Sequence, residues 1–72
     1  MYIAPYILSA REAEVLTMVA TGTPVDEVAS ELFLSPHTVR THIKNIRRKL
    51  HARTCAQAVA LACVNNLISP NF

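Results

Sequence analysis

Basic and hydrogen-bonding side chains recur along residues 37–51 at a spacing that gathers them on one face of a helix. Positions three and four apart share a helix face, and the residues that do so here are His37, Arg40, Thr41, Lys44, Arg48 and His51. Arginine and lysine donate hydrogen bonds to the O6 and N7 atoms of guanine, and a threonine methyl group can contact a thymine methyl group. The pattern predicts a helix that reads base edges in the major groove of DNA.

The charge of the chain is divided sharply along the sequence. Residues 1–34 contain all five acidic residues and one basic residue, whereas residues 35–53 contain six basic residues and no acidic residue. Such an asymmetry of sign favours a polyanionic partner. The alternative is a basic helix face that is simply solvated.

The opposite face of the same segment independently predicts a helix over residues 36–50. Four aliphatic side chains lie within about 60° of one another at 100° per residue, and they are Val39, Ile43, Ile46 and Leu50. Ser35 can cap the start of this helix, and Pro36 suits its first turn. The segment therefore has one face for a core and one for a partner.

Three further short helices are expected around it. Ser9 and Glu12 have the spacing of a capping box, and Gly22 closes the helix that this box begins. Thr23 is expected to cap the second helix, because proline is tolerated in the first turn that Pro24 would occupy.

The second and third helices are separated by only two residues, Phe33 and Leu34. Helix-turn-helix proteins often have glycine in this turn, and Phe33 in its place predicts a turn that needs no positive φ. A short turn between two helices is the geometry that offers the second helix to a DNA groove.

The fourth helix is expected to begin at Thr54, which has capping-box spacing with Gln57. The helix is apolar nearly all round. The stripe expected to face the core is Cys55, Ala58, Val59, Ala62 and Cys63, and the opposite side carries Ala60, Leu61 and Val64. A helix of this kind is buried on two sides. Because four short helices cannot cover both, the second side is predicted to contact another molecule.

The 72 residues form one all-α domain, with 51% hydrophobic and 17% charged residues. Residues 1–7 are interpreted as an extended lead-in, residues 8–68 as the domain and residues 69–72 as a tail. No apolar run approaches the ~20 residues of a membrane span, and the N-terminus lacks the basic segment of a signal peptide. We expect a soluble cytoplasmic protein with no membrane partner.

Neither catalysis nor metal binding is expected. His37 and His51 lie about 21 Å apart along one helix, too far to share a metal ion. Cys55 and Cys63 lie roughly 12 Å apart, beyond the reach of a disulfide, and no charged residue beside them would activate a thiol. The chain is also too small for a deep cleft, so we expect no enzyme and no cofactor.

Short motifs extend from residue 8 to residue 68. They are Leu8-Ser-Ala-Arg-Glu12, Glu27-Val-Ala29, Thr38-Val-Arg-Thr-His-Ile43, Gln57-Ala-Val59 and Leu67-Ile68. Together they resemble the DNA-binding domain of the LuxR/FixJ/GerE class of bacterial transcription regulators, and the block from Thr38 to Ile43 is the most specific. One departure is Cys55, which stands where that family often has a basic residue.

The resemblance implies a four-helix LuxR-type helix-turn-helix domain whose third helix enters the major groove of double-stranded DNA. Base edges would be contacted by Arg40, Thr41 and Lys44. The remaining predicted DNA contacts are Ser35, His37 and Thr38 at the start of the helix, and Arg48 and Lys49 at its end. The family likeness further implies a homodimer on DNA through Ala60, Leu61 and Val64. RNA polymerase is a further candidate partner, and the site of action would be the bacterial cytoplasm.

Two other functions fit parts of the pattern. Region 4 of extracytoplasmic sigma factors has a similar helix-turn-helix, but it would not need a fourth helix over residues 54–66. A small interaction protein could instead use the apolar fourth helix to bind and silence a regulator. Such a protein could lack specific affinity for DNA altogether.

Overall fold

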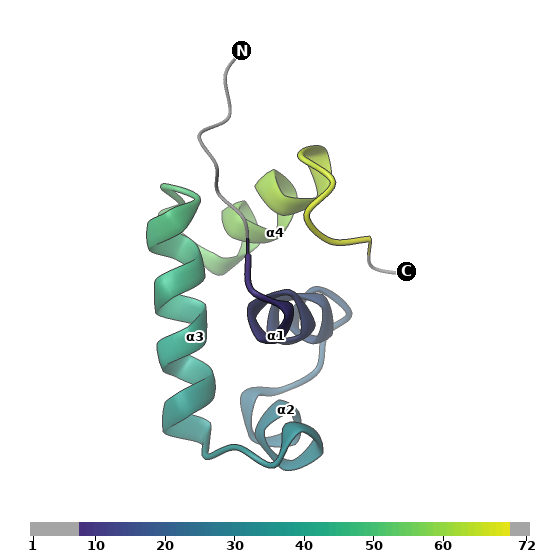
Figure 1. The fold of residues 1–72 in the computed structure, drawn as a ribbon, viewed down its shortest axis with the longest axis vertical. Coiled ribbons are helices and arrows are strands. Elements are labelled where there is room, and N and C mark those ends of the chain that lie inside the picture. Colours follow the sequence, from purple (N-terminus) through teal and green to yellow (C-terminus); the bar gives the residue numbers. More distant parts are fainter. Residues whose placement is uncertain (1–7, 70–72) are drawn as a thin grey trace.

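The computed structural model describes residues 8–69, which form four helices and no strand (Figure 1). The helices are α1 (Ala10–Ala20), α2 (Val25–Leu32), α3 (Pro36–Lys49) and α4 (Cys55–Val64). The predicted all-α fold of four helices is confirmed. The expected lead-in, residues 1–7, and residues 70–72 of the expected tail lie outside the described residues.

Side-chain caps begin three of these helices. The capping box of α1 is confirmed, because Ser9 Oγ accepts from the Glu12 N–H at 3.1 Å and Glu12 Oε1 accepts from the Ser9 N–H at 2.9 Å. Ser35 caps α3 in the predicted way, with its Oγ 3.1 Å from the nitrogen of Thr38. These caps satisfy N–H groups that a helix start otherwise leaves without partners.

The starts of α2 and α4 differ from the predictions. Pro24 rather than Thr23 is the N-cap residue of α2, and it makes no side-chain bond. Thr23 lies one residue earlier and belongs to the end of α1, where its N–H donates to the Met18 carbonyl at 3.0 Å. At α4, Thr54 Oγ1 accepts from the Gln57 N–H at 3.0 Å as expected. In a capping box, the Gln57 side chain would accept from the Thr54 N–H. It accepts instead from the N–H of the preceding residue, Arg53, at 2.7 Å.

Every helix ends in a Schellman motif, in which one residue adopts a left-handed conformation and the next amide closes the turn. The left-handed residues are Gly22, Phe33, His51 and Asn66, with φ of 91°, 58°, 55° and 58°. The closing bonds, of 2.8–3.0 Å, run from Thr23 to Met18, Leu34 to Ala29, Ala52 to Arg47 and Leu67 to Ala62. The prediction for Gly22 is confirmed. The prediction that Phe33 avoids a positive φ is wrong, because the closure of α2 requires that conformation.

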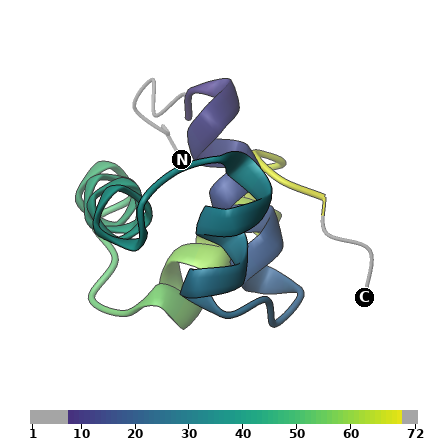
Figure 2. The same cartoon turned by 90° about the horizontal axis from the view of Figure 1, so that it is seen from below.

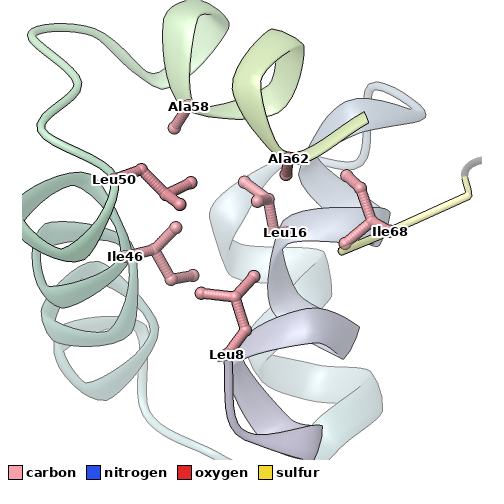
Figure 3. Close-up of a cluster of buried hydrophobic side chains, with 7 residues drawn as sticks. All are labelled: Leu8, Leu16, Ile46, Leu50, Ala58, Ala62 and Ile68. Atoms are coloured by element: carbon pink, nitrogen blue, oxygen red, sulfur yellow. The ribbon is translucent and has the colours of Figure 1, made fainter. Parts of the chain in front are cut away.

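Two hydrophobic clusters hold α3 in place. The first lies where α1, α3 and α4 meet (Figure 3) and consists of Leu8, Leu16, Ile46, Leu50, Ala58, Ala62 and Ile68. The second joins α1, α2 and α3 through Val15, Val28, Ala29 and Val39. The aliphatic face predicted for residues 36–50 therefore contributes to both clusters. Figures 1 and 2 place α3 along one side of the domain. The face of α3 opposite its aliphatic residues is turned away from the other helices.

The apolar side of α4 that is exposed and free for a partner is smaller than predicted. Leu61 is half-buried and packs against the first cluster, whereas Ala60 and Val64 are exposed. Leu61 follows Ala58 by three positions, so it flanks the buried stripe instead of facing away from it. The side of α4 that is free for a partner therefore centres on Ala60 and Val64.

Candidate nucleic-acid interface

The predicted contact residues at the middle of α3 are exposed and unengaged. The side chains of Arg40 and Lys44 form no hydrogen bond or ion pair with any residue between 8 and 69. The aliphatic face of α3 is buried in both hydrophobic clusters, so Arg40 and Lys44 on the other face are directed to solvent. Charged donors with no internal partner lose no protein contact when they bind an acceptor elsewhere.

The hydroxyl of Thr41 is already engaged within the helix. It donates to the carbonyl of His37 at 3.1 Å. The methyl group of the exposed Thr41 side chain therefore remains available for an apolar contact. An apolar group such as a thymine methyl would be a suitable partner for it.

The start of α3 offers hydrogen-bond donors. Ser35 Oγ and Thr38 Oγ1 lie 2.9 Å apart and share one hydroxyl hydrogen, while Ser35 Oγ also accepts the Thr38 N–H. One of the two hydroxyl hydrogens is therefore left for another acceptor. His37 is exposed in the same turn, which contains no acidic residue. The positive end of the helix dipole makes this turn suitable for a phosphate oxygen.

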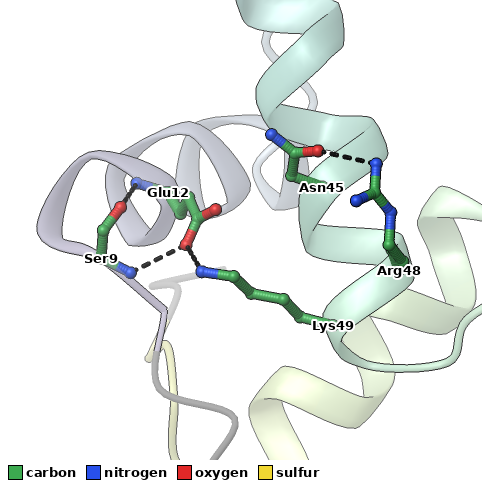
Figure 4. A network of polar contacts seen from close by, with 5 residues as sticks. All are labelled: Ser9, Glu12, Asn45, Arg48 and Lys49. Atoms are coloured by element: carbon green, nitrogen blue, oxygen red, sulfur yellow. Dashed lines mark hydrogen bonds and ion pairs between the residues drawn. The ribbon is translucent and has the colours of Figure 1, made fainter.

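The two predicted phosphate contacts at the end of α3 differ from each other (Figure 4). Arg48 is exposed, and within residues 8–69 its side chain bonds to Asn45 of the same helix alone, at 3.2 Å. Lys49 Nζ instead lies 2.7 Å from Glu12 Oε1 on α1. Sequence reasoning missed this pair because the partners are 37 positions apart. The preceding residue, Arg47, donates to the Arg53 carbonyl beyond the helix end.

Glu12 is a buried acid that joins two elements. Its side chain is only 8% exposed. Burial opposes ionisation of the carboxyl, but hydrogen bonds from Lys49 and from Ser9 outweigh it and hold the pKa of Glu12 below its ordinary value. The carboxylate thereby links the start of α1 to the end of α3.

Glu12→Gln is expected to lower the free energy of unfolding by about 1–2 kcal/mol at neutral pH, because the amide loses a charged hydrogen bond. The lowered pKa means that the wild type keeps the ionic contribution above the ordinary carboxyl pKa of ~4.3 and loses it as the pH falls through the folded value. Urea unfolding at several pH values would show the variant and wild type converging in acid. The control, Glu14→Gln, removes an exposed pair of 3.6 Å and should change stability by only about 0.5 kcal/mol. A constant difference between Glu12→Gln and wild type at every pH would contradict this account.

Residues 8–69 contain no group of three or more His, Cys, Asp or Glu side chains that could hold a metal ion. Cys55 and Cys63 are both free thiols and half-buried. None of the four helices is long and apolar enough to cross a membrane.

The sequence is similar to several bacterial regulators. It is 42% identical over 66 residues to the probable transcriptional regulatory protein NarL of Mycobacterium tuberculosis, covering 92% of this chain and 30% of that protein. It is 40% identical over 62 residues to the transcriptional regulatory protein LiaR of Bacillus subtilis, covering 86% and 29%. The response regulator protein VraR of Staphylococcus aureus matches at the same identity and length, covering 86% and 30%. The chain thus spans less than a third of the length of these relatives.

The fold is likewise that of a known transcription factor. The solved structure of GerE superposes with a TM-score of 0.84 at 27% identity, covering 86% of this chain and 92% of that one. The family model described as bacterial regulatory proteins, luxR family, matches residues 6–62. The match includes all of α1, α2 and α3 and most of α4. This chain therefore belongs to the LuxR family of bacterial regulatory proteins, whose helix-turn-helix domains bind DNA and regulate transcription.

Proposed function

We propose that this domain recognises a specific DNA sequence by placing α3 in the major groove. The observation that carries the proposal is the row of exposed side chains on α3, in which Arg40 and Lys44 have no partner among residues 8–69. Two long cations one helical turn apart can each reach guanine O6 and N7. Thr41 lies between them in the sequence, with its methyl group free for a thymine.

Phosphate contacts at both ends of α3 would fix the register of these base contacts. Ser35 and Thr38 share a spare hydroxyl donor at the helix start, where His37 is also exposed, and Arg48 is exposed near the helix end. Phosphate contacts position a protein on the duplex without reading its sequence. Lys49 is a weaker candidate, because a phosphate would have to compete with Glu12 for its ammonium group.

Selection of bound duplexes from a random pool tests the proposal. The expected result is a short enriched motif, bound at least about a thousandfold more tightly than a scrambled duplex. Equal affinity for selected and scrambled DNA would contradict it. The absence of any DNA affinity would favour an interaction protein that silences a regulator through α4.

Arg48→Ala is expected to weaken binding to all duplexes by a similar factor, because a phosphate contact carries no sequence information. The slope of log affinity against log salt concentration should decrease by roughly one. Titrations at several salt concentrations measure both effects. An unchanged slope would remove Arg48 from the interface.

Dimer formation on DNA is the second part of the proposal. Val64 is 78% exposed on α4, and Ala60 is exposed one turn before it, with half-buried Leu61 at the edge. Two-fold operators are read by two recognition helices about one helical turn of DNA apart.

The relatives named above are regulators about three times as long, so further segments and RNA polymerase are candidate partners of the whole protein. A DNA target would place its action in the bacterial cytoplasm.

A further inference from the structure

Phe33, in the turn between α2 and α3, is 95% exposed. Its backbone is left-handed, with φ of 58° and ψ of 42°. Bulky residues rarely adopt this conformation, because it brings Cβ close to the following carbonyl oxygen. The other three helices end on Gly22, His51 and Asn66, residue types that tolerate it better. Neither folding nor solubility therefore favours phenylalanine at position 33. A contact between the ring and a binding partner would favour it.

The turn fixes the backbone of Phe33 so that its side chain stays outside the core. The Phe33 N–H donates to the Ser30 carbonyl at 3.3 Å, and the Leu34 N–H donates to the Ala29 carbonyl at 2.8 Å. Leu34 then packs against the second hydrophobic cluster. With the backbone fixed on both sides, the ring has no route into the core. Because the backbone is already ordered and the side chain has only two rotatable bonds, binding of the ring costs little conformational freedom.

The position of the ring selects DNA as the partner. Phe33 precedes Ser35 by two residues, which span at most about 7 Å of chain. The ring is therefore within reach of the sugar next to a phosphate bound by Ser35 and Thr38. The neighbours of Phe33 along the chain do not form the apolar patch that would favour a protein partner, because Glu31 and Ser35 are exposed and polar, while Leu32 and Leu34 are half-buried.

We propose that Phe33 is a DNA-contact residue whose ring lies against a deoxyribose of the backbone where α3 enters the groove. The inference rests on the proposed function and adds an apolar contact to it. A deoxyribose presents C–H groups that are the same in every sequence, and contact with them releases no counterion. The contact would thus contribute affinity without sequence preference or salt dependence.

Phe33→Asn tests this inference, because asparagine tolerates the left-handed conformation and removes the ring. The variant should unfold at the same or a higher temperature than the wild type. Its affinity for a single selected half-site and for scrambled DNA should fall by the same factor, about fivefold for the loss of one partly buried aromatic contact. The salt slope should stay unchanged. Ala10→Asn, which introduces the same side chain at an exposed position of α1, should bind the half-site as the wild type does.

Phe33→Gly serves as a second variant and should behave in the same way. If either folded variant binds DNA with wild-type affinity, the inference is overturned. This holds also if the variant has lost binding to another protein, because the ring would then contact that protein and not DNA. A loss confined to the selected duplex would also overturn it, because it would indicate a base contact. Loss of the helical circular dichroism signal in both variants would show that the ring is structural. Failure of the proposed function would look different, since the wild type itself would then not distinguish selected from scrambled DNA.

Discussion

Arg40→Ala is expected to reduce affinity for the selected duplex by about 5- to 150-fold, equivalent to about 1–3 kcal/mol. Arg40 is exposed in the second turn of α3 and has no partner among the described residues, so its removal leaves no internal group unsatisfied. The loss should fall on recognition and leave the fold intact. A bidentate arginine also discriminates one base pair from the others, and preference should relax at one position per half-site.

Affinities for the selected duplex, for single-base variants of it and for scrambled DNA measure this effect. Arg11→Ala is the matched control, because Arg11 is the one basic residue outside residues 35–53 and lies on α1. It should bind every duplex nearly as the wild type does. An equal loss by Arg40→Ala on selected and scrambled DNA would mean that Arg40 touches only the backbone.

Val64→Asp is expected to abolish the gain in affinity that a palindrome gives over a single half-site. The exposed surface around Ala60 and Val64 is only a few side chains wide, well below the ~1,000 Å² of a stable interface. Self-association in free solution should therefore be weak. Two adjacent half-sites on one duplex raise the effective concentration of one copy for the other. A carboxylate on each copy would oppose that contact by desolvation and repulsion.

Half-site affinity should be nearly unchanged in this variant, since α3 is untouched. Ser30→Asp adds the same charge at an exposed position of α2 and should keep the palindromic gain. If the wild type gains nothing from the second half-site, or Val64→Asp retains the whole gain, α4 is not the dimer surface.

The sequence predicted those parts of the fold that depend on local rules. Capping spacing located the starts of α1 and α3, and helical periodicity identified the buried residues of α3 such as Val39 and Ile46. These features were predictable because the interactions lie within four residues of each other. The same periodicity placed Arg40 and Lys44 on the exposed face.

The errors arose where neighbouring elements meet. Thr23 does not cap α2, because it completes the motif that closes α1 and the helix begins one residue later. Phe33 adopts a positive φ because the closure of α2 outweighs its residue preference. The ion pair of Glu12 with Lys49 depends on how α1 packs on α3, which no local pattern contains. The packing of α1 on α3 therefore engages Lys49 with Glu12, whereas Arg40 and Lys44 keep no partner among the described residues.

The central claim is that the exposed face of α3 carries the base-reading contacts. Titration of the isotopically labelled domain with its selected duplex, followed by amide and side-chain chemical shifts, tests it most directly. The account predicts that the largest changes occur at Arg40, Thr41 and Lys44, with smaller ones at Ser35 and Arg48, and that scrambled DNA leaves the first three little changed. Changes confined to α1, α2 or α4, with α3 unaffected by the selected duplex, would contradict it.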